Sequence, residues 1–588
     1  MIDYPYLKEQ PTSRKTVEVF KGYNRNLRIG AGEFCGMENM TADHNPVLSP
    51  RGKRGRIEPL ADPKGMFRVP SGALYFTDGD KLLMHSSGMT HTVATGLIET
   101  NIHRQFALMG KALIIVPDMK WLDIGNPFSG LHGMGETWKV EAGKVTVSLC
   151  KGEELYYEVY QNVTTSPEPP SNPGNQTLWI DNSQSPSCLK QYRALTEEWM
   201  DVPTTYLKIS GLGDHRFEEG DGITLSGLGD GSNIQVSALN GSHVIRHMGH
   251  GEIVITGILD ETWEQDCGEY PVTLERMPPQ LDFVVEAGNR LWGCIQGVNE
   301  IYACKLGDFK NWNVFSGLST DSWVGNVGAS GKFTGAINQG GYPVFYTENS
   351  KHKVWPSATG AHQITSTPCL GVEQESYGSL ALYNGQLLYL SPEGVCMDDG
   401  SGPVTVDQSL AGLACSDGVG AVHQHKYYLC ATDRLGKWHL LVYDLRTGLW
   451  HREDGAAFLD MVSHEGRLYG AGRGHLWDLT GHEGTPEEKV SWRVRTGDLM
   501  LEIPDRKYIT RLTLRMSLEP GSKVEIFARY DHEEGLTKLG TAYGRKLGSF
   551  SLPVRPRRCD HLQLELQGEG MAKIYSITKT LEKGSELP

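Results

Sequence analysis

The chain has 588 residues, of which 39% are hydrophobic and 22% are charged, and it contains 70 glycines. This composition indicates a folded protein of two to four domains and excludes a peptide hormone, a small disulfide scaffold and a disordered tail. No apolar run approaches the roughly 18 to 20 residues that span a bilayer, and Met1–Pro5 lacks a basic segment followed by an apolar one. We therefore expect no membrane-spanning segment and no secretion by an ordinary signal peptide.

The net charge of −15 is unevenly distributed. Residues 1–70 carry 12 basic and 8 acidic groups and residues 485–588 carry 18 and 15, so about −22 falls on the residues between them. This balance argues against a general nucleic-acid binder, because phosphate contacts need Lys and Arg. The 11 cysteines include no C-x-x-C pair, which argues against a zinc ribbon and favours reduced, buried thiols.

A turn followed by a short apolar strand recurs along the chain, whereas windows with helical periodicity are almost absent. The later copies lie 53, 44, 40 and 41 residues apart, and a period near 40 with several strands per unit is typical of a β-propeller blade. The copies are Gly79–Leu83, Gly110–Ile114, Gly288–Trp292, Gly341–Phe345, Gly385–Tyr389, His425–Leu429 and Gly466–Tyr469. The sequence thus predicts an all-β fold with a six- or seven-bladed β-propeller.

The spacing between the second and third copies exceeds one period by roughly 140 residues, which predicts an inserted domain. Its short strands, among them Ile234–Val236, indicate a small β-barrel or sandwich. Strict alternation of apolar and polar residues in Arg511–Met516 and His561–Leu566 predicts a C-terminal β-sandwich. The predicted domains are an N-terminal arm or docking segment at 1–70, first blades at 71–125, the inserted β domain at 126–279, remaining blades at 280–484 and the sandwich at 485–588.

Known catalytic patterns are missing from the sequence, which has no G-x-S-x-G, no H-E-x-x-H and no Gly-rich phosphate loop. His243, His247 and His250, with Glu252 nearby, offer the donor types of a metal site, but a polar loop is the favoured interpretation. We therefore predict no catalytic residue, no cofactor and no metal, and we do not expect an enzyme.

A basic cluster in the N-terminal arm is the one predicted contact site, and it consists of Arg51, Lys53, Arg54 and Arg56. We predict that this cluster makes an assembly contact with an acidic partner, with nucleic acid as the alternative on charge grounds. The arm itself is expected to extend and to become ordered on a neighbouring subunit. Core packing is expected for the tryptophans of the predicted blades, which are Trp292, Trp312, Trp323, Trp438, Trp450 and Trp477.

Several segments resemble tail and neck-region proteins of tailed bacteriophages and prophages, and the architecture is similar to that of the nozzle proteins of short-tailed phages. The segments that carry this resemblance are Phe20–Asn24, Gly32–Met40, Pro46–Arg54, Asn289–Cys294, Leu306–Trp312, Val442–Trp450 and Leu552–His561. The resemblance covers nearly the whole chain, and no single motif in it is specific.

This resemblance implies a structural virion protein of the tail, made in the cytoplasm of the host bacterium. It implies a homo-oligomeric ring, expected to be a hexamer, that contacts adaptor or portal-proximal tail proteins and tail fibres or spikes. DNA would pass between subunits during genome ejection without specific binding. Two alternatives stay open: a receptor- or glycan-binding protein at the tail tip, and a propeller glycosidase.

Overall fold

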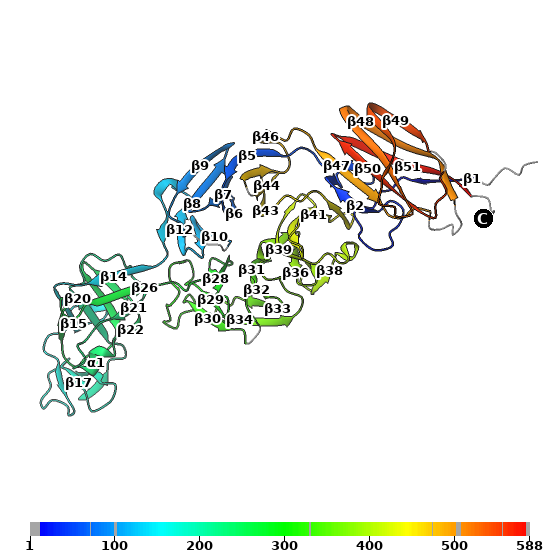
Figure 1. Ribbon diagram of the computed structural model, residues 1–588. Coiled ribbons are helices and arrows are strands. Elements are labelled where there is room, and N and C mark those ends of the chain that lie inside the picture. Colours follow the sequence, from blue (N-terminus) through cyan, green and yellow to red (C-terminus); the bar gives the residue numbers. More distant parts are fainter. Residues whose placement is uncertain are drawn as a thin grey trace, which may run out of the picture.

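The computed structural model describes residues 12–70, 72–98, 103–328, 331–472, 474–500, 507–554 and 557–583. Three parts follow one another in space: the inserted domain, a ring of small sheets, and a C-terminal sheet assembly that also contains N-terminal strands (Figure 1). All eleven cysteines are free. No helix among the described residues has the length and apolar character needed to cross a membrane.

Seven small antiparallel sheets form the ring, and contacts between the first strands of neighbouring sheets lead from β43 back to β6. The predicted all-β fold is confirmed, and the seven sheets have the arrangement expected of a seven-bladed β-propeller. The first two blades are β6 (Pro63–Val69), β7 (Ala73–Asp78), β8 (Lys81–Ser86) and β9 (Met89–Ala94), and then β10 (Gln105–Met109), β11 (Ala112–Val116), β12 (Lys120–Asp123) and β13 (His132–Gly133).

The other five blades follow the inserted domain in the chain. They are β27 (Phe283–Glu286), β28 (Leu291–Cys294), β29 (Glu300–Ala303) and β30 (Trp323–Asn326); β31 (Gly335–Gln339), β32 (Tyr342–Thr347), β33 (Ser350–Trp355) and β34 (Gln363–Pro368); β35 (Ala381–Tyr383), β36 (Gln386–Ser391), β37 (Gly394–Asp398) and β38 (Pro403–Thr405); β39 (Cys415–His423), β40 (Lys426–Asp433), β41 (Trp438–Asp444) and β42 (Leu449–Arg452); and β43 (Phe458–His464), β44 (Arg467–Gly472) and β45 (Gly474–Asp478).

The seventh blade is completed by an N-terminal strand. Strand β5 (Gly55–Leu60) pairs antiparallel with β45 and also with the short strand β46 (Thr485–Pro486). The chain then enters β6, the first strand of the first blade, so the last and first blades share one continuous segment. The ring is closed by pairing between two distant parts of one chain.

The N-terminal arm differs from its predicted extended form, because its described residues fold onto their own chain. Strand β1 (Thr12–Val17) pairs with β51 (Ala572–Lys583), and β2 (Phe34–Glu38) pairs with β47 (Ser491–Thr496). Residues 1–11 of the predicted arm lie outside the described residues. The short pair β3 (Met40–Thr41) and β4 (Ser49–Pro50) follows β2.

Gly22 shows why the chain turns as it does between β1 and β2. Its φ is +74°, a left-handed value that glycine adopts without strain. A Cβ atom at this position would lie 2.3 Å from the carbonyl oxygen of Trp450, which already accepts a 2.7 Å hydrogen bond from the Tyr23 N–H. The arm is therefore fastened to the sixth blade, and Phe20, Phe34 and Trp450 belong to one buried core.

The C-terminal part has two layers that share long strands, as predicted for a sandwich. Strand β48 (Lys507–Tyr530) pairs with β51 along its first half and with β50 (Leu562–Glu569) along its second half, while β49 (Thr537–Pro553) follows it throughout. Alternate residues of β48 are buried, as the sequence pattern predicts for a strand with one wet face.

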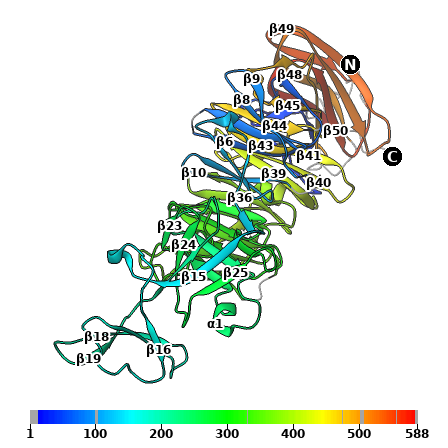
Figure 2. The same ribbon diagram turned by 90° about the vertical axis from the view of Figure 1, so that its left-hand side faces the viewer.

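The inserted domain comprises three sheets and one short α-helix, and its outermost sheet lies at the end away from the ring (Figure 2). Its strands are β14 (Glu136–Val140), β26 (Val272–Arg276), β21 (Gly222–Ser226) and β22 (Gly241–Val244); β23 (His247–Gly249), β24 (Glu252–Thr256), β20 (Tyr206–Ser210), β15 (Lys144–Cys150) and β25 (Trp263–Asp266); and β16 (Thr164–Ser166), β17 (Leu178–Asp181), β18 (Cys188–Arg193) and β19 (Glu198–Asp201).

The predicted strand at Ile234–Val236 is wrong, because α1 (Ile234–Ser237) occupies this segment. The Asn233 side chain caps the helix: its Oδ1 accepts hydrogen bonds from the N–H groups of Gln235 at 2.9 Å and Val236 at 3.2 Å. A cap of this kind satisfies N–H groups that a helical turn leaves unpaired. The apolar pattern of this segment is compatible with either a strand or a helix, and the cap favours the helix.

We expect Arg54→Ala to destabilise the propeller strongly. Arg54 is 3% exposed, and its guanidinium lies 2.7 Å from carboxylate oxygens of both Glu453 and Asp454. Removing the cation leaves these carboxylates only their longer contacts to Arg51, at 3.8 Å and 3.4 Å, which costs about 3 to 5 kcal/mol in the free energy of unfolding. Denaturant titration should show this loss, whereas Lys53→Ala, at an exposed neighbouring position, should change stability by less than about 0.5 kcal/mol. Equal effects of the two substitutions would contradict the ion-pair argument.

A second prediction concerns acid sensitivity. His352 in β33 is fully buried between the hydroxyls of Ser350 and Ser366, and burial lowers the pKa of its imidazole from 6.5 to about 4. Because the folded state disfavours the charged ring, its stabilising contribution is present above pH 6.5 and is lost as the pH falls to about 4, by about 3 kcal/mol in total. His352→Gln should flatten the pH dependence of the unfolding free energy over this range. An unchanged pH profile would show that His352 does not titrate on unfolding.

Candidate functional site

A groove of about 450 Å³ opens between the fourth and fifth blades. The fourth blade supplies one wall from β31, β32, β33 and β34, and the fifth blade supplies Gly385, Asp399 and Gly400 from two of its turns. Nearer the ring axis the same two blades pack through buried residues, including Val344, Leu387 and Tyr389. The groove is thus the outer, open end of a packed interface between blades.

Two aromatic rings form the wall of this groove. Tyr342 begins β32 and Trp355 ends β33, and their ring centroids lie 4.8 Å apart with the planes inclined by 59°. Trp355 is 41% exposed, and its Nε1–H donates a 3.0 Å hydrogen bond to Thr365 Oγ1 of β34. The indole is therefore both accessible and held in one orientation.

Charged groups complete the groove. The Lys353 Nζ lies 4.1 Å from the ring centroids of both Tyr342 and Trp355, a cation–π arrangement on two rings. Lys351 reaches across to the fifth blade, where its Nζ lies 2.7 Å from Asp398 Oδ2, and Asp398 is fully buried. This ion pair joins the two blades at the groove and so holds β33, which carries Trp355, in a fixed position relative to the fifth blade.

Aromatic rings from different blades also meet near the propeller axis. His103, two residues before β10, and Tyr377 of η3 (Tyr377–Ser379) have ring centroids 6.1 Å apart, and the ring centroids of Tyr377 and Phe283 of β27 lie 5.6 Å apart. Burial lowers the pKa of His103. Side chains therefore occupy the centre of the ring at this level.

A carboxyl group with a strongly shifted pKa lies beside this aromatic cluster. Asp460 of β43 accepts hydrogen bonds of 2.7 Å from the N–H groups of Met66 and Met461, and so links the seventh blade to the first. Burial raises its pKa to about 7, and these two N–H donors only partly oppose the shift. Near neutral pH, Asp460 can therefore hold or release a proton.

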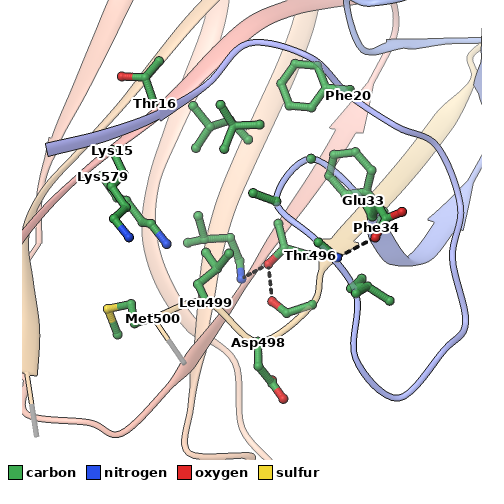
Figure 3. Close-up of a pocket in the computed structure, with 18 of the residues that line it drawn as sticks. Lys15, Thr16, Phe20, Glu33, Phe34, Thr496, Asp498, Leu499, Met500 and Lys579 are labelled. Carbon is green, nitrogen blue, oxygen red and sulfur yellow. Dashed lines mark hydrogen bonds between the residues drawn. The ribbon is translucent and has the colours of Figure 1, made fainter. Parts of the chain in front are cut away.

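A second cavity, of about 510 Å³, lies between the N-terminal segment and the C-terminal sheets (Figure 3). Phe20, Phe34, Leu499 and Met500 give it an apolar wall. Its two phenylalanines are 3% and 1% exposed, so neither ring is available for stacking against a polar ligand. The cavity lacks the combination of open aromatic faces and polar groups that the groove between the blades provides.

The residues predicted for an assembly contact occupy two different environments. Arg51 and Arg54 are buried and paired with Glu453, Asp454 and Glu487 within the chain; Arg51 Nη1 lies 2.6 Å from Glu487 Oε2. The other two members of the cluster, Lys53 and Arg56, are exposed. The assembly contact and the oligomeric ring stay predictions.

The histidines considered as metal ligands are each engaged separately. His243 Nε2 lies 2.7 Å from the carbonyl oxygen of Leu239, whereas His247 pairs with Glu219 and His250 with Asp214. Among the described residues, one group does have ligand atoms close enough to share an ion: Asp498, His532 and His561.

Sequence reasoning missed both the groove and this second cluster. The six tryptophans expected in the core include the buried Trp292, Trp312 and Trp450 and the partly buried Trp323, Trp438 and Trp477. The exposed Trp355 was not among them. Its signal lay in strand alternation, since Lys351, Lys353 and Trp355 share one face of β33 while His352 and Val354 face the core.

No family model matches the chain, and no curated protein matches it. Among solved structures, an exo-beta-1,3-galactanase from Phanerochaete chrysosporium matches with 12% identity and a TM-score of 0.20, over 50% of this chain and 94% of that one. A family 43 arabinoxylan arabinofuranohydrolase from Bacillus subtilis matches with 9% identity and a TM-score of 0.14, over 66% of this chain and 94% of that one. The extracellular domain of a one component system from B. thetaiotaomicron matches with 9% identity and a TM-score of 0.17, over 93% of this chain and 98% of that one.

These findings correct the expectation of a phage tail protein. The similar structures are glycoside hydrolases and an extracellular sensor domain, not phage tail components, so the predicted family, the nozzle and genome-ejection role and the location in a virion are wrong. The expectation that the chain is not an enzyme is contradicted by the same glycoside hydrolases. Identities and TM-scores this low transfer no substrate and no residue role to this chain.

Proposed function

We propose that this protein binds carbohydrate through the groove between the fourth and fifth blades. The observation that carries the proposal is the exposed, oriented indole of Trp355 next to Tyr342 and Lys353. The C–H groups on one face of a sugar ring stack on aromatic rings, while its hydroxyls need polar partners at the rim. The groove offers both kinds of contact within one concave surface.

The polar partners come from several strands. Thr365 and Thr367 of β34 place hydroxyls beside the rings, and Asp399 presents an exposed carboxylate from the facing blade. Lys353 adds an ammonium group with three N–H donors. This set of donors and acceptors supports a ligand rich in hydroxyl groups and argues against a purely apolar one.

A glycan array probed with the purified full-length chain tests the proposal. For a glycan that binds, Trp355→Ala should weaken the affinity at least tenfold, about 1.4 kcal/mol, because the stacking surface is lost. Titration calorimetry measures the change. Tyr543→Ala is the matched control, since Tyr543 is 68% exposed on β49, away from the groove, and its removal should leave the affinity unchanged. An array with no bound glycan, or equal affinities for wild type and Trp355→Ala, would refute the proposal.

Glycoside hydrolysis is the second candidate function, and it is favoured by Asp460. A carboxyl group with a pKa near 7 is suited to act as a general acid that protonates a leaving group at neutral pH. Hydrolysis also needs a second carboxylate within several ångströms. Asp417 is the candidate for this role, because it lies close enough to His103 of the same aromatic cluster to act on the pKa of that imidazole. Glu373 is a further carboxyl group in this region, and burial, with a smaller effect of Asp417, raises its pKa.

Release of reducing ends from bound glycans tests this second function. Asp460→Asn should lower the rate by about 100-fold or more, and the wild-type rate should fall as the pH rises above about 7, because the acid loses its proton. Asp230→Asn, at an exposed turn of the inserted domain, should leave the rate unchanged. Asp417→Asn serves as a second variant if Asp460→Asn fails to fold. Glycan binding without turnover would leave the binding function and exclude the hydrolase.

A further inference from the structure

Three potential metal ligands meet at one end of the C-terminal sheets. Asp498 follows β47, His532 lies in the turn after β48, and His561 directly precedes β50. One ligand atom from each lies within 4.8 Å of the other two. Backbone hydrogen bonds fix these positions: Leu499 and Leu562 pair through both of their N–H groups, and the Asp531 N–H donates to the His561 carbonyl oxygen at 3.1 Å.

His561 is oriented as metal-binding histidines usually are. Its Nδ1 lies 3.1 Å from Asp560 Oδ2, a contact in which the ring donates its Nδ1 proton to the carboxylate. The other nitrogen, Nε2, is buried without a hydrogen-bond partner. Carboxylates hold metal-bound imidazoles in this way, since they fix the tautomer and the ring orientation.

Asp498 contributes a second buried atom without a partner. Its Oδ2 lies 3.2 Å from His532 Nε2, while its Oδ1 has no hydrogen-bond partner and no contact with solvent. A buried polar atom without a partner is costly in a folded protein, because it has lost its water without a replacement. A cation bound by the cluster would provide a partner for both Asp498 Oδ1 and His561 Nε2.

His532 provides the third donor of the cluster, and it lies on the side of the cluster that is exposed to solvent. Its ring centroid lies 4.6 Å from that of His561, and its side chain is 55% exposed. Asp531 and His532 have φ values of +45° and +55°, so two consecutive residues adopt the left-handed conformation that places this imidazole at the cluster. An ion can therefore enter from solvent.

We propose that Asp498, His532 and His561 bind a divalent transition-metal ion of the Zn²⁺ class. Two imidazoles and one carboxylate are donors typical of Zn²⁺, Co²⁺, Ni²⁺ and Fe²⁺, whereas Ca²⁺ and Mg²⁺ prefer oxygen ligands throughout. Three protein ligands leave at least one coordination position for water or another ligand. This site lies on the C-terminal sheets and is independent of the carbohydrate groove.

The Asp498 carboxylate also connects the metal site to the apolar cavity of Figure 3. Asp498, Leu499 and Met500 all line that cavity, and in the close-up the carboxylate points away from Leu499 and Met500. Ordinary pairing between Asp498 and His532 is the competing explanation for the cluster. It accounts for their 3.2 Å contact but not for the free Oδ1 of Asp498 and the free Nε2 of His561.

The test uses the full-length chain without a histidine tag, treated with a chelator and then titrated with Co²⁺ followed by Zn²⁺. We expect one Co²⁺ per chain with the visible absorption of a nitrogen- and oxygen-bound ion, and displacement of Co²⁺ by Zn²⁺. His561→Ala and His532→Ala should each lower the Co²⁺ affinity at least tenfold. Zn²⁺ should raise the melting temperature of the wild type and leave that of either variant unchanged.

Two controls keep the outcome decisive. His247→Ala and His250→Ala remove histidines that pair with single carboxylates in the inserted domain, and they should not affect Co²⁺ binding. Asp498→Asn conserves the side-chain shape and serves if a histidine variant fails to fold. No saturable Co²⁺ binding by the wild type, or equal affinity in wild type and His561→Ala, would overturn the proposal.

Discussion

Closure of the seven-bladed ring is the constraint on which the rest of the molecule depends. A blade packs both faces against neighbours, so the first and last blades must meet, and here a strand from residues 55–60 completes the last blade. Just before that strand, buried Arg54 is held between Glu453 and Asp454. A buried cation needs such partners, so the position of Glu453 and Asp454 fixes where Arg54 lies. Arg54 directly precedes β5, so its position also fixes how β5 is aligned with β45.

The closed ring explains why a groove can be formed between two blades. The fourth and fifth blades are packed tightly near the axis, and the Lys351–Asp398 pair joins them further out. Trp355 therefore lies on a strand of a blade that is held against its neighbour. A side chain on such a strand keeps its position in a binding surface better than a side chain on a loop. The same rigidity holds Asp460 between the seventh and first blades, where its burial shifts its proton affinity.

Local chemistry made much of the fold predictable. Each recurring turn found in the sequence is a hairpin turn of one blade, because Gly or a polar residue must occupy such positions whatever the tertiary context. The groove could not be predicted, since Trp355 and Asp399 meet across two blades and no local signal distinguishes an exposed indole from the buried one of Trp292. The resemblance to phage proteins failed for a related reason. Gly22, one of the residues on which it rested, is required because the backbone passes close to Trp450, and this requirement of the fold says nothing about function.

The attachment of the inserted domain has a consequence for how such a molecule can diversify. Its first strand, β14, pairs with its last, β26, so the chain leaves and rejoins the ring at neighbouring points, with Glu136 opposite Arg276. The domain also rests on the third blade, where Asn311 forms hydrogen bonds with Asp221 and Gly222. An insertion placed between two blades in this way adds a whole domain without interrupting the strands of any blade.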